Sequence, residues 1–172
     1  MKMFYASVRF DSGAQDQQFL PDKAIAVRRR WANKILCSGK IWEIRGTKCH
    51  HRGRVAIAIS GTGLLFGEVR VVDCIQVGQW NESEGLRPVG SLQDSDFIGR
   101  DANKRFHQID DLSIVRYKKV FAWVLSDAKE YLNPIPYEHR RGAVTWIVEV
   151  RDGLSLEYVA VSIELNQASR WC

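Results

Sequence analysis

The spacing of apolar residues along the chain changes abruptly at Gly39. Before this glycine, Trp31 and Ile35 stand one helical turn apart, which gives the segment an apolar face at helical spacing. Glycine is the residue that most often ends a helix in a left-handed conformation. The pattern therefore predicts a short helix that begins near Trp31 and stops at Gly39.

After the glycine the apolar spacing becomes two, as in a strand with one buried face. Trp42 and Ile44 are expected to be buried. Glu43 and Arg45 then lie on the opposite face, with Lys40 at their edge. Three ionisable groups gathered at a helix-to-strand corner are a candidate site, and a solvated strand face is the alternative.

Most of the remaining pattern predicts strands. The segment 55–60 is almost wholly apolar and should be a central strand buried on both faces, and the segment 66–74 alternates well. The polar segment 81–112 predicts an insertion with short helices over one end of the barrel. Further strands are predicted over 4–10, 24–27, 120–125, 144–150 and 156–165. Many strands with few, short helices predict an α+β fold, a small mixed β-barrel that is closed or nearly closed.

The composition is that of one ordinary globular domain. The chain has 172 residues, enough for one sizeable core, and 45% of them are hydrophobic. We therefore expect a single domain over residues 1–172. No apolar run approaches the length of a membrane span, and the N-terminal segment lacks the long apolar centre of a signal peptide. These features predict a cytoplasmic location.

Positive charge is concentrated in one part of the chain. Residues 22–54 contain ten lysines and arginines against two acids, although the whole chain carries a net charge of +5. A basic field with nearby tryptophans suits a polyanion whose bases can stack, so nucleic acid is favoured over a merely solvated helix face. The basic residues expected to contact such a ligand are Arg28, Arg29, Arg30 and Lys34.

The adjacent residues Cys49, His50 and His51 invite a metal interpretation. Neighbouring residues of an extended segment point apart, however, and no second ligand pair follows at the spacing of a zinc site. No structural metal site is therefore predicted.

The sequence around the candidate site resembles the signature of the ASCH domain, a branch of the PUA-like superfamily. The resemblance rests on Lys40-x-x-Glu43-x-Arg45, which follows a Trp-Ala helix and precedes a Gly-Arg strand. The family usually has glycine two residues before the lysine, whereas this chain has Ser38 there and Gly39 one place later. The resemblance spans roughly residues 24–150 and continues through 54–60, 67–74, 121–125, 133–137 and 142–146.

This resemblance implies a PUA-like barrel with a cleft lined by the lysine, glutamate and arginine of the signature. It places the far wall of the cleft in the later half of the chain, where Tyr137, His139 and Arg140 lie. The roles associated with the family are RNA binding, ribonuclease action and hydrolysis of the amide on acetylated cytidine. RNA or a nucleotide-like ligand is therefore the expected partner.

Binding without chemistry is the favoured interpretation of the site. Glu43 beside Lys40 should keep the ammonium protonated, and a protonated lysine holds phosphate but cannot take a proton. In this interpretation Arg45 contacts phosphate and Glu43 accepts a hydrogen bond from a base edge.

The first alternative is a hydrolase of the ASCH type in which Lys40 and Glu43 act chemically. A ribonuclease would also need cations on the phosphate and a base, either Glu43 or a histidine such as His139. Such a ribonuclease could use a divalent metal, manganese or magnesium; no cofactor is predicted otherwise. The remaining candidate histidines are His50, His51 and His107. A second alternative is a protein-interaction module whose contact surface is the acidic segment 81–112.

Overall fold

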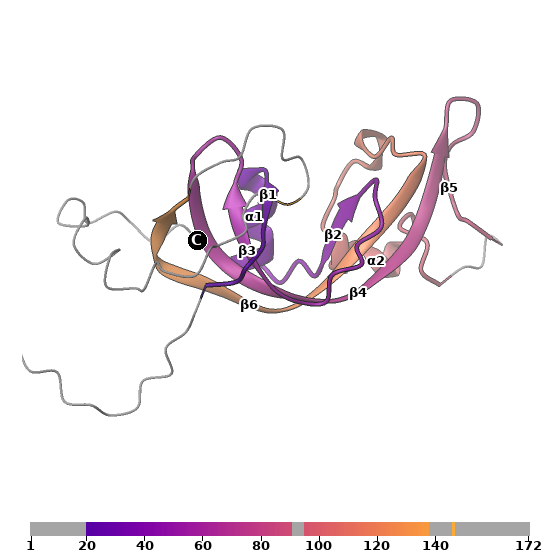
Figure 1. Cartoon of the computed structure of the whole chain (residues 1–172). Helices are drawn as coiled ribbons and strands as arrows, with labels where there is room; N and C mark the ends of the chain where they lie inside the picture. The colour runs from indigo at the N-terminus through magenta and orange to yellow at the C-terminus, as the bar shows by residue number, and fades with distance from the viewer. Residues whose placement is uncertain (1–19, 91–94, 138–145, 147–172) are drawn as a thin grey trace, which may run out of the picture.

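The computed structural model describes residues 20–90, 95–137 and 146 (Figure 1). The elements in chain order are β1 (Ala24–Val27), α1 (Arg29–Cys37), β2 (Trp42–Arg45), β3 (Gly53–Ile59), β4 (Leu64–Asn81), β5 (Gly85–Arg87), α2 (Asp101–His107), the 3-10 helix η1 (Leu112–Ile114) and β6 (Lys119–Pro136). This confirms the predicted α+β class. The strands predicted over 4–10, 144–150 and 156–165 lie outside the described residues. Neither α-helix of the described ranges is long and apolar enough to cross a bilayer.

The strands form one mixed sheet with the order β1-β3-β4-β6-β2, and β5 pairs with β4. β1 runs parallel to β3, and the other pairs are antiparallel. The two end strands, β1 and β2, are not hydrogen-bonded to each other in the described part of the chain, so the sheet is open and the predicted closed barrel is not confirmed. Figure 1 shows a strongly curved sheet that carries β1 and α1 on one side and β2 on the other.

The curvature comes from the two longest strands. β4 and β6 have 18 residues each, and their pairing shifts register at four places. Such bulges insert an extra residue on one strand, and they bend and twist the ladder locally. One bulge in β6 contains Asp127, which has a left-handed φ of 51°. The bent ladder leaves the unpaired edges of β1 and β2 on opposite sides of one hollow.

The core confirms that β3 is a central strand. Val55 and Ile57 pack in one apolar group together with Trp123, whereas Ala56 and Ala58 pack in another on the opposite face. A strand buried on both faces reads as a continuous apolar run, which is why the sequence identified it. Trp42 belongs to a third group, with Val77 and Ile98, beneath α2.

Both ends of the helix-to-strand corner have the expected form. α1 ends at Cys37, and Gly39 adopts a left-handed φ of 70°. The N–H of Lys40 then donates back to the carbonyl of Lys34 at 3.0 Å, which turns the chain sharply toward β2. α2 covers the other side of β2, where the ring of Phe106 lies 5.1 Å from that of Trp42.

Gly67 is required where β4, β6 and α1 meet. A methyl group at this position would lie 2.4 Å from the carbonyl oxygen of Lys129 and 2.7 Å from Leu36. We expect Gly67→Ala to lower the free energy of unfolding by about 1–3 kcal/mol, because the backbone of β6 must shift to admit it. Gly90→Ala is the matched control, since a methyl group at Gly90 would meet no atom of the described residues within 4 Å. Thermal unfolding of the two variants checks this, and equal midpoints would contradict it.

Candidate functional site

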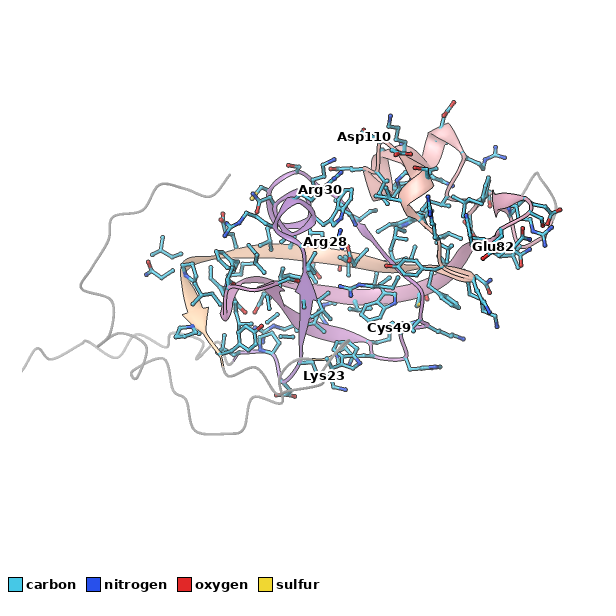
Figure 2. The ribbon with its side chains drawn as sticks, turned by 90° about the horizontal axis from the view of Figure 1, so that it is seen from above. Lys23, Arg28, Arg30, Cys49, Glu82 and Asp110 are labelled. Carbon is cyan, nitrogen blue, oxygen red and sulfur yellow. The ribbon has the colours of Figure 1, made fainter. Side chains whose placement is uncertain are left out.

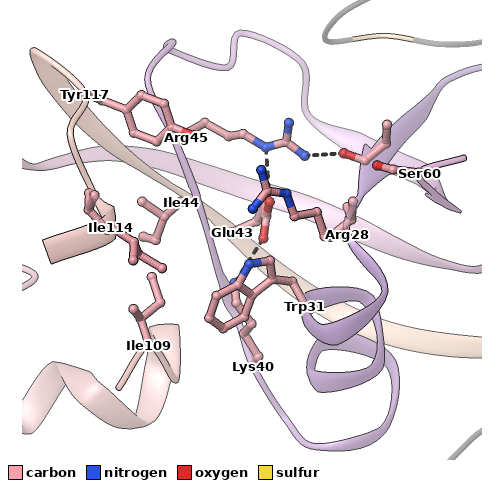
Figure 3. A pocket seen from close by; sticks show the side chains of 13 residues that line it. Arg28, Trp31, Lys40, Glu43, Ile44, Arg45, Ser60, Ile109, Ile114 and Tyr117 are labelled. Carbon is pink, nitrogen blue, oxygen red and sulfur yellow. Dashed lines mark hydrogen bonds and ion pairs between the residues drawn. The ribbon is translucent and has the colours of Figure 1, made fainter. Parts of the chain in front are cut away.

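A cleft of about 380 Å³ lies in the hollow between β1 and β2 (Figure 3). One wall comes from the end of β1 and the start of α1, and β2 together with Lys40 forms the floor. The other wall comes from the chain between α2 and β6. The lining residues are Ala26, Val27, Arg28, Trp31, Lys40, Glu43, Ile44, Arg45, Ser60, Ile109, Ile114, Val115 and Tyr117.

The floor holds a chain of three buried or half-buried charges. Lys40 Nζ lies 3.1 Å from Glu43 Oε2 and also donates to the carbonyl of Trp42. Arg45 Nε lies 3.1 Å from Glu43 Oε1, close enough for an ion pair, although its N–H is not aligned for a hydrogen bond. Lys40 is 2% exposed and Glu43 6% exposed. Lys40 lines the cleft together with Glu43 and Arg45, and the sharp turn after Gly39 buries its side chain in the floor.

The predicted alternation along β2 is confirmed in part. Trp42 packs in the core, and Glu43 and Arg45 both line the cleft. Ile44 is half-buried and also lines the cleft, so the apolar face of this short strand is not wholly covered.

Arg45 joins the two unpaired edges of the sheet. Its Nη2 donates to the carbonyl of Ala26 in β1 at 2.7 Å, and its guanidinium lies 5.7 Å from the ring centre of Trp123. A side chain thus spans the gap that a strand pairing would close in a barrel. The contact holds β1, and with it the start of α1, at a fixed place relative to β2.

Burial lowers the pKa of Lys40 below its ordinary value of 10.5. The neighbouring carboxylate of Glu43 acts in the opposite direction, but the loss of hydration is the larger effect. The expectation that Glu43 fixes Lys40 as an ammonium therefore describes only the weaker of two opposing influences.

Of the two aromatic residues of the walls, the sequence indicated Trp31 only as a tryptophan beside the basic residues, and it did not identify Tyr117. Trp31 is half-buried on α1. The centre of its ring lies 4.1 Å from the guanidinium carbon of Arg30 and 5.8 Å from Lys40 Nζ. Its helical spacing from Ile35 indicated only an apolar face. Tyr117 stands on the opposite wall over Gly46, where a methyl group would come within 2.7 Å of its ring.

The basic residues predicted on α1 take different positions. Arg28 lines the cleft with an exposed side chain. The guanidinium of Arg29 faces the ring of Phe66 in β4 at 5.8 Å instead. Lys34 Nζ donates to the carbonyl of Gln108 at 2.7 Å and so ties α1 to the end of α2. Arg30 packs on Trp31, as described above.

The predicted far wall is not assembled from the described residues that were expected there. The N–H of Tyr137 donates to Gly63 at 3.0 Å, and its side chain packs against the apolar group around Ala24, away from the lining of the cleft. His139 and Arg140 lie outside the described residues. Residues 109–117 form the wall instead, and nothing in their local pattern indicates which distant strand they face.

The described histidines lie away from the cleft lining. His50 and His51 border a second cavity. His107 is fully buried in α2, and its burial lowers its pKa. Its Nδ1 accepts from the N–H of Ile109 at 3.0 Å, which directs the ring into the protein.

The described residues do not form a metal site. Nowhere in the described ranges do three histidine, cysteine, aspartate or glutamate side chains come close enough to hold an ion. Glu43 is the one carboxylate in the cleft lining that the structure describes, and it is flanked by two cations. This arrangement repels a divalent cation, so the residues of the floor do not fit manganese or magnesium.

The protein has an α+β fold in which an open, curved sheet carries two α-helices in the described residues. A basic cleft lies at its helix-to-strand corner. The family model of the ASCH domain matches residues 25–139, so the chain belongs to the ASCH domain family. The match covers the described elements except Ala24 at the start of β1, and it ends at residue 139, before the end of the span of roughly 24–150 that the sequence motifs indicate.

Solved structures of an ASCH protein from Zymomonas mobilis are similar to this chain. Two single-substitution variants of that protein match with TM-scores of 0.53 and 0.55 at 14% identity, covering 82% and 83% of this chain and 96% and 99% of theirs. A further structure of the ASCH protein matches with a TM-score of 0.48 at 15% identity, covering 87% of this chain and 86% of that one. At this identity the likeness establishes the fold alone. A search of curated proteins finds no match.

The charge arrangement of the floor makes Glu43 the sensitive position. Glu43→Gln leaves the two cations without a counter-charge, and we expect the free energy of unfolding to fall by about 3–5 kcal/mol at neutral pH. Lys40→Met should cost less, because Glu43 keeps Arg45 as its partner. Urea unfolding at neutral pH measures both.

The Glu43→Gln variant should recover stability as the pH rises. Burial holds the pKa of Lys40 below 10.5, and removal of Glu43 lowers it further. Between the folded pKa and 10.5 the unfolded chain binds more protons than the native one, so stability increases with pH in that window. The deficit of Glu43→Gln relative to wild type should therefore shrink toward alkaline pH. The double variant with Lys40→Met should lose this dependence, and a pH-independent deficit would refute the assignment.

Proposed function

We propose that the cleft binds RNA or a nucleotide-like ligand. The observation that carries this is the charge of its lining, in which Arg28, Lys40 and Arg45 face a single carboxylate, Glu43. The lining has a net positive charge even after the buried ion pairs are counted. Such a hollow attracts an anion, and phosphate is the anionic group of nucleotides.

The shape of the cleft supports a ligand of nucleotide size. Its volume of about 380 Å³ is in the range of small-molecule sites and is too small for a folded partner. Trp31 and Tyr117 stand on opposite walls, with Ile109 and Ile114 on the same side as Tyr117 (Figure 3). Aromatic and apolar walls suit the face of an unstacked base. These features favour a nucleotide over the protein-interaction alternative.

The roles of the charged residues follow from their burial. Lys40 and Arg45 already contact Glu43 and backbone carbonyls. They therefore contribute positive charge to the floor of the cleft and are not free to turn toward a phosphate. Arg28 differs, because its side chain is exposed at the rim and its guanidinium can turn to a phosphate (Figure 3). An arginine is suited to hold two phosphate oxygens at once.

Arg28 and Arg29 form a matched pair for testing this proposal. Arg28→Ala should weaken binding of a short single-stranded RNA by about threefold to tenfold and reduce the salt slope of the affinity by about 0.7, because one phosphate contact is lost. Arg29→Ala removes the same charge one residue away, on the side of Phe66, and should change the affinity by less than about twofold. Fluorescence polarisation across a salt series measures both. Equal effects of the two changes would contradict the cleft as the binding site.

Hydrolysis of the bound ligand is the second candidate function, and one observation favours it. The lowered pKa of Lys40 increases the fraction of neutral amine, which is the form that can take a proton from water or from a ribose hydroxyl. Glu43, at 3.1 Å, is placed to orient the amine. The products would be RNA fragments for a ribonuclease, or cytidine and acetate for an amidohydrolase on acetylated cytidine.

A turnover assay separates the two candidates. We expect wild type to bind RNA without degrading it and to leave acetylated cytidine intact, with or without manganese. One reason is that Lys40 and Arg45 both remain paired with Glu43. The other is that no described histidine lines the cleft as a second group to carry a proton. Hydrolysis that is present in wild type and abolished in a folded Lys40→Met variant would establish the hydrolase instead.

A further inference from the structure

A second cavity, of about 460 Å³, lies at the other end of β1. It is bordered by the residue before β1 and by the loop between β2 and β3. The lining includes Lys23, Lys48, His51, Arg52, Trp123 and Trp146. Three of these residues are cations, and the lining contains no carboxylate among the described residues.

Aromatic rings pack together in this cavity, and a lysine lies over one of them. The rings of Trp123 and Trp146 are stacked with their centres 5.5 Å apart, and His51 meets Trp146 edge-on at 5.4 Å. Lys23 Nζ lies 5.2 Å from the centre of the Trp146 ring. A lysine beside an aromatic ring is suited to a nucleotide, because the cation can contact a phosphate while the ring contacts a base.

The loop that forms the cavity is fixed by internal contacts. Arg52 donates to the carbonyl of Cys49 and to Asp73, each at 3.0 Å, and the ring of His51 lies 3.3 Å from the carbonyl oxygen of Arg54. Arg52 is therefore occupied in holding the loop. Lys48, on the same loop, has an exposed side chain and no such tie among the described residues. The cavity is thus preformed and presents its lysines to a ligand.

The second cavity continues the first along the open side of the sheet. Trp123 lines the second cavity, and Arg45, which lines the first, lies 5.7 Å from its ring. The two sites thus share one partition. Lys23 and Arg28 mark the two ends of β1 (Figure 2), five residues apart, which is roughly 16 Å of extended chain. A single nucleoside cannot reach both, whereas a polynucleotide can.

We infer that the second cavity is a subsite for the neighbouring nucleotides of a single-stranded nucleic acid, one nucleotide of which occupies the first cleft. This inference rests on the proposed function. It makes the ligand a polymer, with Lys23 and Lys48 contacting the backbone and the Trp146 edge contacting a base. Because the open edges of β1 and β2 run between the two cavities, the strand lies along the gap that Arg45 spans.

The test compares ligands of two lengths on two double variants. The probes are uridine monophosphate and a fluorescent oligouridine of about eight nucleotides. The Lys23→Ala/Lys48→Ala variant should bind the oligomer about tenfold more weakly than wild type and lose about 1.4 from the salt slope, since two phosphate contacts disappear. Its affinity for the monophosphate should not change. The Lys104→Ala/Arg105→Ala variant removes two charges from α2, away from both cavities, and should bind the oligomer as wild type does.

Each other outcome decides against the subsite. An unchanged affinity for the oligomer, or equal losses for both probes, would overturn it while leaving the first cleft as the binding site. The same conclusion holds if wild type binds the oligomer no more tightly than the monophosphate. If wild type binds neither probe, the proposed function fails and the subsite fails with it. Thermal unfolding checks that both double variants are folded, because Lys23 is half-buried over the Trp146 ring whereas Lys48, Lys104 and Arg105 are exposed.

Discussion

The carboxylate of Glu43, buried between two cations, is the interaction on which the arrangement of the cleft depends. In a site shielded from water, charge pairs are strong and unpaired charges are costly, so the positions of Lys40 and Arg45 are tied to that of Glu43. Arg45 then reaches the carbonyl of Ala26 on the opposite edge of the sheet. Glu43 therefore holds both cations of the floor, and through Arg45 it ties the floor to the wall at β1.

Because the sheet is open, the contact between Arg45 and β1 crosses a gap between two strand edges. Unpaired strand edges expose backbone groups that must be satisfied by something else, and folds manage them by covering or closing them. Here the gap between β1 and β2 is crossed by an arginine side chain, which satisfies a carbonyl but leaves space on either side of itself. The cleft occupies the space above Arg45, and the second cavity lies beyond Trp123, whose ring centre is 5.7 Å from the Arg45 guanidinium.

The sequence predicted the parts of this arrangement that are local. The change of period at Gly39 gave α1 and β2, and the apolar run gave β3, because these follow from neighbouring residues. The lengths of β4 and β6 could not be predicted, since each bulge interrupts the period-two pattern and looks like the end of a strand. The wall at 109–117 depends on contacts across the fold. The strand pattern placed Lys40 beside Glu43 and Arg45, but the depth of its burial follows from a turn that only the three-dimensional path reveals.

The two opposing influences on Lys40 also constrain what the cleft can do with a ligand. Burial favours the neutral amine, whereas Glu43 favours the ammonium. A phosphate bound above the floor adds a second negative charge, which raises the pKa of Lys40 and makes it hold the proton more firmly. Binding an anion and accepting a proton therefore demand opposite states of the same side chain. In the proposed complex, a phosphate on Arg28 would act on Lys40 less strongly than one on the floor, so the depth of the anion would decide whether Lys40 could serve as a base.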